Sequence, residues 1–164
     1  MPDVFRLLFK YFWVVMLALM TFNYFKTIRA LGAKSEGVGR LSDSSKAYVA
    51  RFAIAASLPW VVMGAGQVLG STPSVWYYFR PQDGNPFVLA WFALIFSLWC
   101  IYAWWIFFAE GAAKVREMHL MALFGVPSRT MQSERTIKLF ALIGPLMFPI
   151  LIYTMVSMNA QVPK

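Results

Sequence analysis

Four apolar segments alternate with polar stretches along the chain. They cover about residues 11–28, 48–69, 87–108 and 139–158. A helix needs about 20 apolar residues to cross a hydrocarbon core of about 30 Å, so each segment predicts a transmembrane helix. Asn23 and Lys26 interrupt the first segment, whereas the third contains no charged residue. If the first segment does not span the membrane, one span is lost and the N-terminus changes side.

The polar stretches between the segments predict three connecting loops. The first, residues 26–47, contains glycines and serines and is expected to be a flexible loop. The second, residues 70–86, carries the aromatic run 76–79, which is typical of the belt at a membrane–water boundary. The third, residues 111–138, is expected to begin as a continuation of the helix before it, because Glu110 and Lys114 have a favourable i,i+4 spacing.

A short apolar run, residues 120–126, interrupts the third loop. It is too short to cross a bilayer, and Gly125 and Pro127 end it. We expect a short helix here that lies at the membrane interface or packs under the bundle. Pro59, Pro145 and Pro149 fall inside predicted spans, where proline kinks a lipid-embedded helix more often than it ends it.

The composition agrees with this pattern. Of the 164 residues, 60% are hydrophobic and only 13% are charged, whereas soluble domains carry about 25% charged residues. Because so few charges cannot cover the surface of a soluble domain, lipid must cover much of the exterior. The sequence therefore predicts an all-α membrane protein: a single transmembrane helical domain, residues 1–164, formed by a bundle of about four helices.

The basic residues predict an orientation and a partner. Most of the fifteen lysines and arginines lie in or beside loops 26–47 and 111–138. The positive-inside bias places these loops in the cytoplasm and both termini outside, although Arg6 and Lys10 pull the other way. The net charge of +8 is expected to attract anionic lipid headgroups and not nucleic acid, because the bases flank apolar spans. In size and style the chain resembles small bacterial inner-membrane proteins, which suggests that location.

Reactive side chains are few and scattered. Glu110 is the only acid close to a predicted span, where it could act as a coupling site or as an interfacial carboxylate paired with Lys114. His119 and Glu117 supply at most two of the three or more ligands that zinc needs. Cys100 lies in an apolar segment without charged residues, where a thiol is expected to be unreactive. We therefore expect no catalytic constellation, metal or cofactor, with Glu110, Glu117 and His119 as weak functional candidates.

Two features of the spans suggest helix packing. Small residues follow one another along the second segment, which allows close helix approach: Ala53, Ser57, Gly64, Gly66 and Gly70. The third segment is studded with aromatic residues, which suggests lipid contact plus a partner surface, or alternatively an aromatic ligand pocket.

Three function classes follow from these features. The leading hypothesis is a non-catalytic accessory or scaffold subunit that packs against another membrane protein or against itself. The alternative is a small oligomeric transporter or channel for an apolar or weakly polar solute, with a path near Pro59, Gly64, Gly66, Pro145 and Pro149. A third class, a membrane enzyme on lipid or quinone substrates, would have to use Glu110, Glu117 and His119.

Overall fold

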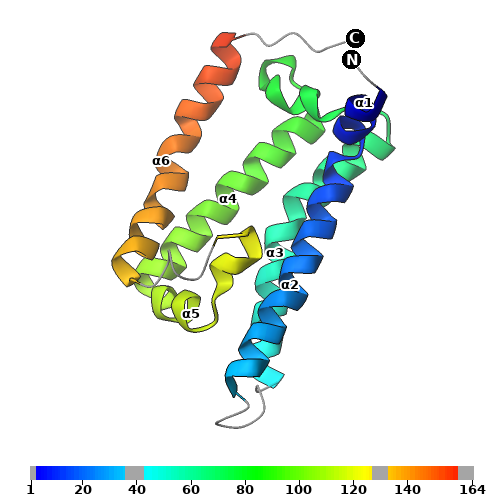
Figure 1. The fold of residues 1–164 in the computed structure, drawn as a ribbon. Coiled ribbons are helices and arrows are strands. Elements are labelled where there is room, and N and C mark those ends of the chain that lie inside the picture. Colours follow the sequence, from blue (N-terminus) through cyan, green and yellow to red (C-terminus); the bar gives the residue numbers. More distant parts are fainter. Residues whose placement is uncertain (1–2, 36–42, 127–132, 159–164) are drawn as a thin grey trace.

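The computed structural model describes residues 3–35, 43–126 and 133–158, and shows an all-α chain there (Figure 1). In chain order the helices are α1 (Asp3–Lys10), α2 (Phe12–Ser35), α3 (Asp43–Val68), η1 (Val75–Phe79), η2 (Pro81–Asp83), α4 (Pro86–Phe108), α5 (Gly111–Glu117), η3 (Leu120–Phe124) and α6 (Glu134–Met158). Helices α2, α3, α4 and α6 are long and apolar enough to cross a membrane. The predicted bundle of four membrane helices is therefore confirmed.

The ends of the first two spans differ from the prediction. Helix α2 continues to Ser35 and α3 already begins at Asp43, so the described parts of the expected flexible loop, residues 26–35 and 43–47, are helical. Residues 36–42 lie outside the described residues. The helix continues because Ala30, Leu31 and Ala33 are compatible with a helix and Leu31 is buried against the bundle. The hydrophobic span thus ends before the helix does.

The four long helices form a row in the order α2, α3, α4, α6 (Figure 1). Helix α2 packs on α3, α3 on α4, and α4 on α6. One end of the row, which we call the basic end, holds the C-terminal end of α2, the start of α3, the end of α4, helix α5 and the start of α6. The other end, which we call the far end, holds α1, η1 and η2.

The far end is closed by the second loop. Tyr78 of η1 is almost completely buried there, and Trp76 and Tyr77 are half-buried, so the aromatic run packs onto the bundle more than an exposed belt would. Thr72 donates to the Tyr78 hydroxyl at 3.4 Å, and that hydroxyl donates to the Met63 carbonyl of α3 at 3.3 Å. Burial raises the pKa of Tyr78, and the Thr72 hydrogen bond lowers it to a smaller extent.

The basic end is closed by α5 and η3. Helix α4 ends at Phe108, and Glu110 adopts a left-handed conformation (φ 56°) before α5 begins, so the expected helical continuation is broken. In the described residues no ion pair joins Glu110 to Lys114, whose ammonium lies 5.8 Å from the centre of the Tyr48 ring. The short helix predicted in the third loop is present, and its apolar run takes the packed position: Leu120 and Leu123 of η3 are fully buried.

Candidate functional site

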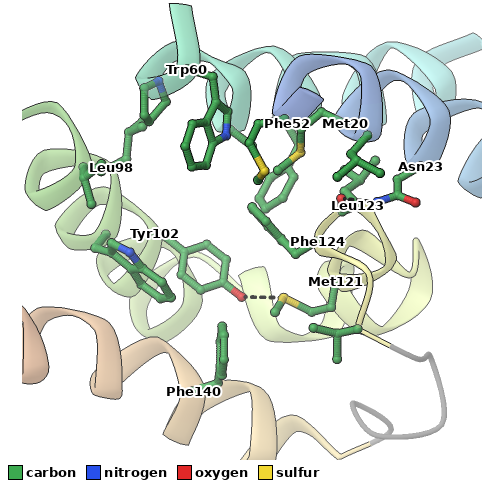
Figure 2. Close-up of a pocket in the computed structure, with 17 residues that line it drawn as sticks. Met20, Asn23, Phe52, Trp60, Leu98, Tyr102, Met121, Leu123, Phe124 and Phe140 are labelled. Atoms are coloured by element: carbon green, nitrogen blue, oxygen red, sulfur yellow. Dashed lines mark hydrogen bonds between the residues drawn. The ribbon is translucent and has the colours of Figure 1, made fainter. Parts of the chain in front are cut away.

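A cavity of about 500 Å³ lies inside the bundle, between the spans and η3 (Figure 2). We call it the span pocket. All four long helices contribute to its wall: Met20 and Asn23 from α2, Phe52 and Trp60 from α3, Leu98 and Tyr102 from α4, and Phe140 from α6; Met121, Leu123 and Phe124 of the η3 segment line it as well. Protein interiors pack closely and leave few voids larger than a water molecule, so a cavity of this size needs an explanation.

The sequence accounts for the position of η3 beside this cavity. Leu120, Met121 and Leu123 are apolar and buried, so the segment turns into the bundle instead of lying in water. A 3₁₀ helix of five residues satisfies few of its own backbone groups, and unpaired groups are costly among apolar spans. The side-chain amide of Asn23 donates to the Leu123 carbonyl at 3.0 Å and satisfies one of them. Asn23, which weakens α2 as a span, thus anchors η3.

The second polar group in the pocket is the hydroxyl of Tyr102. It points into the pocket and donates to the thioether sulfur of Met121 at 3.6 Å (Figure 2). A thioether is a weak acceptor, so this hydrogen bond is easily exchanged for a stronger one. Asn23 and Tyr102 therefore both contact the η3 segment, Asn23 at the Leu123 carbonyl and Tyr102 at the Met121 sulfur.

Aromatic rings surround that polar part. Phe52 lies edge-on to Tyr102 (centroids 6.2 Å apart) and to Phe124 (6.0 Å). Trp99 contacts Tyr102 on the same helix (5.8 Å) and Phe140 of α6 (5.6 Å). These distances are typical of favourable edge-to-face and tilted ring pairs. The rings hold one another in place and give the pocket a rigid wall.

The span pocket is not fully enclosed, because two residues of its wall are partly exposed. Leu19 and Phe124 both line the pocket, yet 48% and 46% of their surfaces are exposed. Helices α2 and α6 are the two edges of the row and do not pack extensively on each other. Leu19 lies within the span of α2. The partly exposed part of the pocket wall at Leu19 therefore lies within a span.

The small residues predicted to pack helices make contacts within the chain. A side chain at Gly64 would meet the Trp13 indole of α2 at 2.7 Å, and one at Gly66 would meet the Tyr78 hydroxyl at the same distance. Ala53 packs against the buried cluster at the basic end, and the Ser57 hydroxyl donates to its carbonyl at 2.8 Å. Gly70 faces open space and adopts a left-handed conformation after α3.

The three weak functional candidates lie around α5 and outside the span pocket. Glu110 precedes α5, Glu117 ends it, and both are exposed. His119, partly buried, precedes η3 with a positive φ of 50°. Within residues 3–35, 43–126 and 133–158 no three His, Cys, Asp or Glu side chains gather to hold a metal.

Sequence reasoning named an aromatic ligand pocket on the third span only as an alternative, and it missed the rest of the span pocket because the wall is assembled from five separated segments. Two signals were visible. One is a polar residue, Asn23, within a span, and the other is an apolar run, residues 120–126, too short to cross. Neither signal indicates that Asn23 and residues 120–126 contact each other in the folded chain.

No protein-family model matches the chain, and no curated protein or solved structure shows significant similarity to it.

Proposed function

We propose that this membrane protein binds an apolar or weakly polar molecule inside the bilayer, in the span pocket. The observation that supports the proposal is an apolar cavity of about 500 Å³ lined by all four spans. Pockets for small ligands are about 300–1,000 Å³, mostly apolar, with a few polar groups that fix orientation. The span pocket has this character: its polar side-chain groups are the Asn23 amide, the Tyr102 hydroxyl and the indole N–H groups of Trp60 and Trp99.

Binding of a solute is also the first step expected of the small oligomeric transporter or channel for an apolar or weakly polar solute, which is the alternative hypothesis from the sequence. Pro59, one of the residues expected beside a solute path, lines the span pocket. Gly64 and Gly66, two others, are covered by Trp13 and Tyr78, and support packing instead. The proposal therefore places the ligand at the basic-end side of Gly64, and it needs no catalytic group.

A pocket-filling variant tests the proposal. Ala56 of α3 lines the span pocket, so Ala56→Phe places a ring inside it. Ala65→Phe, on an exposed part of the same helix, adds an identical ring outside the pocket and is the matched control. Both variants and the parent are extracted from membranes in mild detergent, and their bound apolar molecules are identified by mass spectrometry of an organic extract.

Some apolar compounds should co-purify with both the unmodified protein and Ala65→Phe. We expect these compounds to be absent from purified Ala56→Phe. Thermal unfolding of the three proteins shows whether Ala56→Phe is folded. If Ala56→Phe is folded and carries the same compounds as the parent, the pocket is not their binding site and the proposal is wrong.

The accessory role is the second proposal, and the position of α6 favours it. Among the long helices α6 packs extensively on α4 alone. Its outward side is apolar and exposed, with Leu146 and Ile150 more than half accessible. A partner helix could pack there in place of lipid. Chemical cross-linking in native membranes tests this role: we expect a product that contains residues of α6, and a chain that stays monomeric contradicts it.

A further inference from the structure

The two side chains that hydrogen-bond to η3 lie toward one end of the span pocket, and mainly apolar side chains, with the Trp60 indole among them, line the other. Asn23 and Tyr102 contact the η3 segment at the basic-end side. Met16, seven residues before Asn23, and Ile95, seven before Tyr102, line the opposite part. Seven helical residues span about 10 Å, so the apolar part lies about that far from the polar part along the helix axes. A ligand that fits this pattern has a polar head and an apolar body.

The head has to be uncharged. Among the described residues that line the pocket there is no Asp, Glu, Lys, Arg or His. An ion buried without a partner loses its hydration and gains no compensating charge. Fatty acid anions and phospholipid headgroups are therefore poor occupants of this part of the pocket.

The head also has to accept a hydrogen bond. The Tyr102 hydroxyl donates to Met121 sulfur at 3.6 Å, a weak bond that a ligand oxygen would replace with a stronger one. Met121 has a flexible side chain that can move away. The Asn23 amide, which uses one N–H group for the Leu123 carbonyl, carries a second N–H group. A carbonyl oxygen on the ligand head suits the Tyr102 donor.

The shape of the polar end favours a flat head. Phe52, Tyr102, Trp99, Phe124 and Phe140 place five rings around it, with centroids of neighbouring pairs 5.6–6.2 Å apart. Aromatic walls make favourable stacked and edge contacts with a planar ring. A branched or spherical head would not use these faces.

We infer that the ligand of the span pocket is a neutral lipid of the quinone class. Its carbonyl-bearing ring lies among these aromatic residues and accepts from Tyr102, and its chain extends along α2 and α4 towards Met16 and Ile95. The partly exposed wall at Leu19 and Phe124 lets a chain longer than the pocket continue into the bilayer. This inference rests on the proposed binding function and adds the class and orientation of the ligand.

Three probes that share a long unbranched alkyl chain and differ in the head test the inference. Decylubiquinone has a carbonyl-bearing ring, decylbenzene has a ring without an acceptor, and decanoate has a charged head. Binding of each to the full chain in phosphatidylcholine nanodiscs is measured by mass spectrometry of retained probe, with Ala56→Phe as the background. We expect saturable binding of decylubiquinone, weaker binding of decylbenzene and none of decanoate above that background.

Tyr102→Phe tests the hydrogen bond. We expect it to weaken decylubiquinone binding about three- to tenfold, as for the loss of one hydrogen bond, and to leave decylbenzene unchanged. Tyr153→Phe, on a side chain that is 74% exposed on α6, is the matched control and should change neither. A merely structural role of Tyr102 would weaken both probes alike, and that result would overturn its assignment as the donor.

The outcomes separate the two proposals. If decylbenzene or decanoate binds as tightly as decylubiquinone, and Ala56→Phe abolishes that binding, the pocket binds apolar molecules but the inferred head is wrong. If no probe binds above the Ala56→Phe background and that variant also retains every compound co-purified with the parent, the proposed function itself fails.

Discussion

Gly64 shows how the absence of a side chain at one position of a span allows two helices to pack closely. A β-carbon there would lie 2.7 Å from the Trp13 ring, nearer than side-chain carbons approach one another. The indole therefore lies directly on the backbone of α3, and the close contact of α2 with α3 depends on it. At Gly32 of α2, in contrast, an added β-carbon would meet no atom within 4 Å.

We predict that Gly64→Ala lowers stability by about 1–3 kcal/mol, because the added methyl group forces Trp13 away. Gly32→Ala should be neutral or slightly stabilising, since alanine is the better helix former by about 0.5–1 kcal/mol. Unfolding in mild micelles titrated with sodium dodecyl sulfate measures both. Equal midpoints for the two variants would show that the Trp13 contact does not hold α2 on α3.

The element that distinguishes this chain from a simple row of spans is η3. Its helical turn is short, and apolar burial together with the Asn23 amide keeps it among the spans. The position of a segment at this depth depends on every backbone group finding a partner, because lipid supplies none. Asn23 therefore controls the wall of the span pocket from another helix.

We predict that Asn23→Leu loosens η3 without unfolding the spans. The substitution leaves the Leu123 carbonyl without its donor, which costs about 1–3 kcal/mol. Backbone amide hydrogens of residues 120–126 should exchange roughly tenfold faster or more, as measured by hydrogen–deuterium exchange. Thr21→Val is the control, because the exposed Thr21 hydroxyl donates to Leu17 of its own helix. Unchanged protection of η3 in Asn23→Leu would contradict the anchoring role.

Helices could be predicted from the sequence where one property, hydrophobicity, is maintained over a long stretch of residues. Long apolar runs predict all four spans, including the first, which Asn23 and Lys26 interrupt, because lipid imposes the same requirement along the whole span. The extension of α2 to Ser35 was missed, because polar residues beyond the hydrocarbon say little about where a helix ends. The span pocket could not be predicted, since Asn23 and Leu123 are a hundred positions apart and only tertiary packing brings them together.

At the scale of the whole molecule, Cys100 provides a test of the bilayer position. It is the chain's one cysteine, its side chain is exposed, and it lies eight residues before the end of α4, about 12 Å along the helix. An exposed thiol at that depth faces acyl chains. We predict that in nanodiscs a charged maleimide leaves Cys100 unmodified until detergent denatures the protein.

Two engineered cysteines in a Cys100→Ser background calibrate this experiment. Gln82→Cys lies on η2 at the far end and Glu117→Cys on α5 at the basic end, and both positions are exposed. Both should react rapidly in nanodiscs, whose two faces are accessible. Modification of native Cys100 at the same rate would show that α4 is surrounded by water there.

The same two variants test the orientation, because sealed cells expose only one face to a charged reagent. The described lysines and arginines gather at the basic end, where Lys46, Lys114 and Arg135 flank the spans, whereas Lys10 and Arg80 lie at the far end. Each base near an anionic leaflet gains about 1 kcal/mol, so we expect the basic end in the cytoplasm with anionic lipids around it. Gln82→Cys should therefore react on intact cells, and Glu117→Cys only after permeabilisation. The reverse pattern would mean that the bases of α1 outweigh those of both loops in setting the topology.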